Sequence, residues 1–160
     1  MTTLSQGKAQ LDLIGLSKEA ELLDQTDIFV WLTKAGLPIE VVTRLEDLWS
    51  VTKNIAGQVI HLGKIIIFKI IEFIKAHPHT AAGLLVGAAI GSLVGLVPWL
   101  GPLLAPLTTV IGATIGAMTG AKLDNAGATT AFEGLIILAK QFFQLLAEIF
   151  NVLKDKLAMA

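Results

Sequence analysis

The sequence predicts an all-α fold in which amphipathic helices surround a central apolar helical hairpin. Three observations predict this class. Hydrophobic residues make up 54% of the 160 residues and charged residues only 16%, and the mean hydropathy is +0.72. No ionisable side chain occurs between Thr80 and Ala121, and glycine recurs at every fourth position inside that segment. Because a soluble domain usually carries about 25% charged residues, the composition indicates contact with a lipid bilayer.

The composition also excludes several classes of protein. The chain has no cysteine, which excludes disulfides, thiolate metal sites and a cysteine nucleophile. Twelve basic residues stand against thirteen acidic ones, so there is no charge pattern for binding nucleic acid. The first twenty residues hold Lys8, Asp12, Lys18 and Glu19 and no apolar run, so we expect no cleavable signal peptide and insertion through an internal segment.

Residues 1–53 form an acidic N-terminal region, with five basic and eight acidic residues. We expect short helices here. Ser17 is typical of a helix start, Asp27 opens a second helix that ends at Gly36, and Pro38 fits the first position of a third. The inward positions of the third helix are Val41, Val42, Leu45, Leu48 and Trp49. These acidic helices are the candidate docking region for a protein partner.

Residues 54–79 follow as an amphipathic segment, with a helix expected over 54–76. Its polar positions recur every three to four residues, at Gln58, His61, Lys64, Glu72 and Lys75. Lys69 and Glu72 are spaced to form an ion pair. The helix is too charged to be a third span, and it suits either the membrane interface or packing on the hairpin. No strand pattern is recognised anywhere in the chain.

Residues 80–121 are predicted to form the hairpin. A spanning helix needs about 20 apolar residues, so this segment holds two spans. We expect helices over 80–97 and 103–121, each about 27 Å long, with Pro102 and Pro106 both fitting the start of the second. The residues of the hairpin turn are Pro98, Trp99, Gly101 and Pro102.

Glycines four residues apart define one face of each predicted arm. They are Gly83, Gly87, Gly91 and Gly95 on the first arm and Gly112, Gly116 and Gly120 on the second. Bare helix faces allow close van der Waals packing, which drives helix association in lipid. Two interpretations stay open. Either the two faces pack on each other and tighten the hairpin, or one of them faces another subunit in a homo-oligomer.

Residues 122–160 are predicted to form a turn and a C-terminal amphipathic helix. Asn125–Gly127 is typical of a turn, and Thr130 with Glu133 forms a capping-box pattern ahead of an apolar run. The apolar face is wider than one core contact requires. Its members are Leu135, Ile136, Leu138, Phe142, Phe143, Leu145, Leu146, Ile149, Phe150 and Leu153.

The hairpin needs about six to eight surrounding helices to stay dissolved in water. The chain offers four or five, so we expect the hairpin to face lipid or other subunits, and a soluble oligomer that opens on a membrane also fits. The membrane-flanking residues are Lys75, His77, His79 and Lys122. Their basic side chains place both ends of the hairpin on the cytoplasmic side, in a bacterial inner membrane with both termini inside.

No catalytic, cofactor or metal site is expected. The histidines are His61, His77 and His79, and the last two lack a third metal ligand. They fit a solvated helix end better than a pH sensor, although imidazole titrates near neutral pH. The glycines do not follow a strand and lack the Lys-Ser/Thr ending of a phosphate-binding loop. We therefore expect a protein that is not an enzyme.

The charge-free 80–121 segment, with its Pro98–Pro102 turn and glycine rows, resembles the hydrophobic helical hairpin of pore-forming bacteriocins such as colicins. It is also similar to the glycine-zipper segments of bacterial membrane proteins. The likeness covers about a quarter of the chain. Two-span holins share the layout with both ends inside, and conjugative pilins also use two apolar helices. The resemblance implies a membrane-inserting, self-assembling protein that forms pores. The alternative is a non-catalytic anchor, scaffold or filament subunit whose N-terminal helices recruit a partner.

Overall fold

A computed structural model of the chain describes the backbone of residues 5–120 and 126–158 and the side chains of residues 5–111 and 133–157. The helices in this part of the chain are α1 (Gln6–Glu21), α2 (Gln25–Lys34), α3 (Ile39–Trp49), α4 (Leu62–Ala76), α5 (Ala82–Leu96), α6 (Gly101–Gly120), α7 (Ala126–Val152) and α8 (Lys154–Ala158). A 3₁₀ turn, η1 (Pro98–Leu100), joins α5 to α6, and β1 (Lys53–Ile55) pairs antiparallel with β2 (Gln58–Ile60). The mostly helical fold is confirmed.

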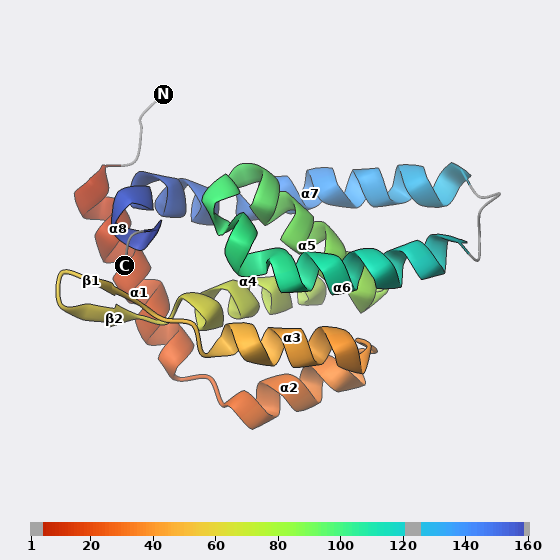
Figure 1. Cartoon of the computed structure of the whole chain (residues 1–160), viewed down its shortest axis with the longest axis horizontal. Coiled ribbons are helices and arrows are strands. Elements are labelled where there is room, and N and C mark those ends of the chain that lie inside the picture. Colours follow the sequence, from red (N-terminus) through yellow and green to blue (C-terminus); the bar gives the residue numbers. More distant parts are fainter. Residues whose placement is uncertain (1–4, 121–125, 159–160) are drawn as a thin grey trace.

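Helix α5 lies at the centre of the fold and packs against α4, α6 and α7 (Figure 1). The later part of α6 and the first part of α7 extend toward the same end of the molecule in Figure 1. Helices α2 and α3 lie on the side of the molecule away from α7, and α3 contacts both α4 and α6. The β-hairpin lies at the other end, where it contacts α1 and α8.

The single chain covers much of α5, one of the two helices of the predicted hairpin. Nine of its residues are buried, and they are Ala82, Leu85, Val86, Gly87, Ala88, Ala89, Ile90, Ser92 and Leu93. Its main helical neighbours are α4, α6 and α7. Ser92, the polar member of the set, donates to Ala89 O at 2.9 Å and so satisfies its own hydroxyl.

The two apolar helices meet at a bend of 119° between α5 and the Pro98–Ile111 segment. Two helices joined by a short turn are confirmed, with bounds close to the predicted ones. The second begins at Gly101, so Pro102 stands in its first turn and Pro106 lies inside it. The outer face of the first turns of α6 is exposed at Pro102, Ala105, Pro106, Thr108 and Thr109.

The first N-terminal helix begins at a different residue from the one predicted. Helix α1 begins after Ser5, whose side chain accepts from Lys8 N at 3.2 Å. Ser17 is therefore not a helix start; it lies buried within α1, where its hydroxyl accepts from His61 N at 2.9 Å. The start of α2 is close to the prediction, because Asp24 caps it by accepting from Asp27 N.

Helix α3 is confirmed with its buried face. Pro38 is the residue just before the helix rather than its first residue. The five residues of α3 that were predicted to face inward are all buried. Gly36, which ends α2, has φ +100°, a conformation that a residue with a Cβ adopts at a cost.

Residues 53–60 contradict two expectations. They form a β-hairpin where no strand was expected, and α4 begins at Leu62 rather than near residue 54. Helix α3 therefore does not continue into α4. The reason is the two-residue turn Ala56–Gly57, in which both residues have positive φ, as hairpin turns of type I′ require. Alanine at such a position is uncommon, so the turn carries a weak sequence signal.

Helix α7 begins earlier than predicted. Ala126 and Gly127 are helical, and Thr130 lies inside the helix instead of capping it. Asn125, the first residue of the predicted turn, lies outside the described residues. No proline occurs between Ala126 and Phe132, and the helix extends upstream of the capping-box pattern.

Gly63 is the point of closest approach between α3 and α4. A Cβ atom there would collide with the backbone carbonyl of Leu48. Gly63 N also donates to Val51 O at 3.0 Å, which fixes the end of α3 against the start of α4. Gly15 is the opposite case, because nothing lies within 4 Å of the position its Cβ would take.

We predict opposite effects for the same substitution at these two glycines. Gly63→Ala should lower the free energy of unfolding by about 3 kcal/mol, because backbone atoms cannot yield to the new methyl group. Gly15→Ala, in the interior of α1, should raise it by about 1 kcal/mol through helix propensity. Urea unfolding of both variants measures the difference, and equal stabilities would contradict the close α3–α4 contact.

Candidate membrane-contacting surface

By length and composition, one helix in the described part of the chain is able to cross a membrane, and a second span is available if the bent pair of α5 and the Pro98–Ile111 segment counts as one. The single helix is the 20-residue stretch Glu133–Val152 of α7. Only a third of its apolar stretch is buried. Much of the apolar surface of this helix is therefore left unburied by the fold.

One side of α7 packs into the core. Ala139, Phe143, Leu146, Ala147 and Phe150 are buried there, and α5 is the main neighbour. Rings cluster at this contact, because Phe73 of α4 lies 5.7 Å from Phe143 and 5.3 Å from Phe142 between ring centroids. These contacts fix how α7 is rotated about its axis.

That rotation leaves four large apolar side chains in contact with water. The exposed fractions are 58% for Ile137, 45% for Leu138, 39% for Phe142 and 62% for Leu145. Leu138, Phe142 and Leu145 follow the helical spacing of one face. We call these four residues the α7 apolar face. It confirms the interpretation that the C-terminal helix has more apolar surface than one core contact uses.

The polar edge of α7 lies over the end of α5. Asn151 Nδ2 donates to Leu96 O at 2.9 Å, which satisfies a carbonyl at the C-terminus of α5. The Lys140 side chain passes 3.9 Å from the position that a Cβ of Gly95 would take. These contacts hold α7 to α5 from the side opposite to the α7 apolar face.

The glycine row of α5 points largely away from close contacts. Nothing lies within 4 Å of a Cβ built at Gly83 or Gly91, and Gly91 and Gly95 are exposed. Gly87 is buried. The open positions of this row in the single chain are therefore Gly83 and Gly91. Gly112, Gly116 and Gly120 lie in α6, and their surroundings are outside the described side chains.

Of the predicted turn residues, Trp99 packs on the C-terminal half of α7. The Trp99 ring lies 6.2 Å from the Phe150 ring and is half-buried. Its Nε1 is buried without a hydrogen-bond partner among the described residues. Gly101 begins α6, and Pro98 and Pro102 are respectively exposed on η1 and on α6. In this folded chain Trp99 serves as a packing residue.

The predicted membrane-flanking residues lie at the turn from α4 to α5. Lys75 Nζ is 5.3 Å from the centroid of the Trp31 ring, and His77 Nδ1 is 3.0 Å from Phe73 O. His79 is exposed, and Lys122 lies outside the described residues. No group of three or more metal-ligating side chains occurs in the part of the chain that the structure describes.

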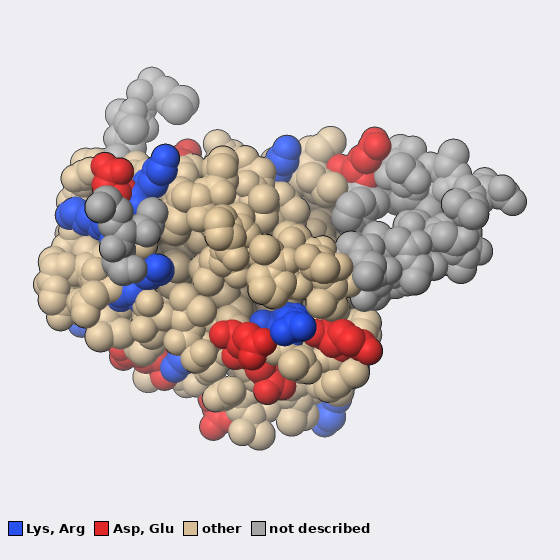
Figure 2. Space-filling view, viewed as in Figure 1, with Lys and Arg blue, Asp and Glu red and all other residues tan. Residues whose placement is uncertain are grey.

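Charge is unevenly distributed over the surface. Figure 2 shows a broad area without Lys, Arg, Asp or Glu over α5 and the start of α6, with charged groups gathered on α3 below it. Within the uncharged area the exposed hydroxyls of Thr108 and Thr109 both donate to Ala105 O, at 2.9 and 3.0 Å. Since these hydroxyls are satisfied within the helix, the outer face of α6 suits an apolar surrounding.

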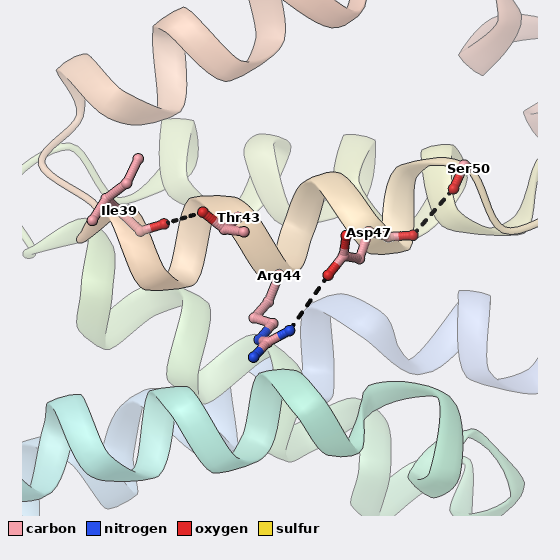
Figure 3. A network of polar contacts seen from close by, with 5 residues as sticks. All are labelled: Ile39, Thr43, Arg44, Asp47 and Ser50. Carbon is pink, nitrogen blue, oxygen red and sulfur yellow. Dashed lines mark hydrogen bonds and ion pairs between the residues drawn. The ribbon is translucent and has the colours of Figure 1, made fainter.

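The N-terminal helices carry a second apolar feature. A groove of about 490 Å³ between α2 and α3 has walls that include Phe29, Val30 and Ile39. Its charged lining residues are Lys34 and Glu46, one of each sign. Elsewhere on α3, Arg44 pairs with Asp47 at 3.6 Å and points toward α6 (Figure 3). The acidic excess of this region is thus not concentrated in the groove.

Residue-level reasoning missed a smaller groove of about 280 Å³ between α1, α4 and α7. It holds the Lys69–Glu72 pair, predicted from spacing and confirmed with 2.9 Å between Nζ and Oε1. Phe142 and Leu145 of the α7 apolar face also line it. No signal in the sequence places Leu16 of α1 opposite these residues.

No protein family, no curated protein and no solved structure that was compared matches this chain.

We predict that the α7 apolar face is needed for binding to lipid vesicles. Leu145→Glu should weaken binding by about tenfold to a hundredfold, because burying a leucine contributes about 1.5–3 kcal/mol and a charge opposes insertion. Gln144→Glu adds the same charge at the neighbouring exposed position and should change binding less than twofold. Co-sedimentation with vesicles measures both. Equal loss in the two variants would show that charge, rather than the apolar face, controls binding.

Proposed function

We propose that this chain is a membrane-inserting, self-assembling α-helical protein that permeabilises the bilayer. The observation that carries the proposal is the α7 apolar face, on a helix long enough to cross a membrane. Each of its four side chains gains about 1.5–3 kcal/mol when lipid covers it, so first contact with a bilayer is favourable without any opening of the fold. The charge-free α5–α6 pair would follow it into the membrane.

Insertion into the membrane requires the fold to open, and α1 is the helix suited to being released at that step. Helix α1 covers part of α4 and α7, yet its buried residues are Ala9, Leu13, Ser17 and Ala20, of which only Leu13 is a large apolar side chain. Ile14 and Leu16 of α1 are partly buried against the core, and its remaining contacts include two polar ones, His61 Nε2 to Glu21 Oε1 at 3.0 Å and Lys156 Nζ to Gln10 Oε1 at 3.0 Å. Such contacts contribute little in water, so a bilayer competes readily for the apolar surface beneath.

The proposed membrane is a bacterial inner membrane with both termini on the cytoplasmic side. Lys64, Lys69 and Lys75 lie on α4, directly before α5, whereas η1 and the start of α6 carry no charge. Basic residues favour the cytoplasmic side, and transfer of an uncharged turn is cheap. The lipid bilayer and further copies of this chain are the proposed partners.

Release of a trapped dye from liposomes tests the permeabilising function. The protein should release dye at concentrations where it binds the vesicles. Vesicles that stay intact at saturating bound protein would overturn this function.

A structural role is the second candidate, because the α2–α3 groove offers a place for a partner protein. In that case the chain would be an anchor, scaffold or filament subunit. Ordered polymers that form with lipid but without leakage would favour it over permeabilisation.

We predict that Gly91→Leu separates assembly from folding. Nothing lies within 4 Å of its Cβ position, so the single chain should fold with unchanged or slightly raised stability. In lipid the added side chain should block close helix approach and lower dye release at least tenfold, with vesicle binding unchanged. Gly134→Leu, at an equally open glycine of α7 outside the glycine rows, is the matched control. Equal dye release by both variants would contradict assembly through the α5 row.

A further inference from the structure

The groove between α1, α4 and α7 differs from the rest of the apolar surface because it combines apolar walls with an ion pair. Leu16, Phe142, Leu145 and Ile149 contribute apolar wall, and Lys69 and Glu72 contribute charge. Phe142 and Leu145 are exposed at its edge, whereas Ile149 is buried. The groove is therefore continuous with the α7 apolar face and leads from it into the fold.

The size of the groove indicates what fits in it. Its volume of about 280 Å³ holds roughly nine water-sized groups, which suits an alkyl segment. One turn of an α-helix is about 5.4 Å long and about 10 Å wide, so it needs about 400 Å³. A complete helix turn therefore does not fit inside the groove, whereas a single hydrocarbon chain does.

The charged residues of the groove indicate the chemistry of the headgroup attached to that hydrocarbon chain. Lys69 Nζ and Glu72 Oε1 lie 2.9 Å apart, with 26% and 42% of the two side chains exposed. A ligand with charge of a single sign would be attracted by one of these two side chains and repelled by the other. A zwitterionic headgroup meets both, since its phosphate can face the ammonium of Lys69 and its own ammonium can face the carboxylate of Glu72.

We propose that this groove binds one acyl chain of a zwitterionic bilayer phospholipid, with the headgroup over the Lys69–Glu72 pair. The inference rests on the proposed contact with a bilayer and names the lipid that the folded chain meets first. The α7 apolar face covers the neighbouring lipid chains while the groove takes one of them. Binding therefore orients α7 along the membrane surface before α1 is displaced.

The test uses a monomeric lipid analogue, so that neither insertion nor leakage is required. Calorimetric titration of the full chain with dodecylphosphocholine, kept below its critical micelle concentration, should give saturable binding of one molecule per chain. Lys69→Gln and Glu72→Gln should each weaken it about tenfold. Exchanging the two residues, as Lys69→Glu with Glu72→Lys, should restore binding, because the groove again presents both signs.

The controls isolate the headgroup contact. Lys8→Gln and Asp12→Asn break an exposed ion pair of α1 that does not line the groove, and they should leave binding unchanged. Equal affinity for dodecyl sulfate or dodecyltrimethylammonium would overturn recognition of a zwitterion, and so would the absence of saturable binding. Dye release without binding of the analogue would remove this inference alone. Binding of the analogue without dye release would remove the permeabilising function alone.

Discussion

The burial of α5 is the constraint on which the rest of the structure depends. This helix has no charged side chain and nine buried residues, so water must be kept from it along most of its length. Helices α4, α6 and α7 provide that cover. Helix α7 has more apolar surface than the contact with α5 uses, and the surplus becomes the α7 apolar face.

The sequence predicted the helices whose signals are local. The 80–121 pair, the inward face of α3 and the amphipathic C-terminal helix follow from charge, proline and periodicity. The errors occur where tertiary contacts override local patterns. Ser17 resembles a helix cap in sequence, but it is buried within α1 and its hydroxyl accepts a hydrogen bond from His61 N. Residues 53–60 form a β-hairpin whose turn includes Ala56 with positive φ. Of the two apolar helices expected to need cover from lipid or other subunits, α5 is largely buried within the single chain, whereas the outer face of the first turns of α6 is exposed.

The candidate surface was only partly predictable for the same reason. Periodicity indicated that the C-terminal helix is too apolar for a single contact, but the choice of exposed residues depends on how α5 and Phe73 orient α7. The Lys69–Glu72 pair follows from spacing along one helix, whereas its place in a groove depends on α1, which lies about fifty residues earlier. Under the proposed function, the open glycines at 83 and 91 are available for assembly in lipid.

Hydrogen exchange in buffer and on vesicles tests the central claim most directly, namely that α5 is the core of the chain in water and stays shielded when the fold opens in a bilayer. We expect the α5 amides to be among the most protected in buffer and to remain protected on vesicles, because lipid replaces the covering helices. The α1 amides should lose protection on vesicles. Rapid exchange of α5 in buffer, or an unchanged α1 in vesicle-bound protein, would contradict the account.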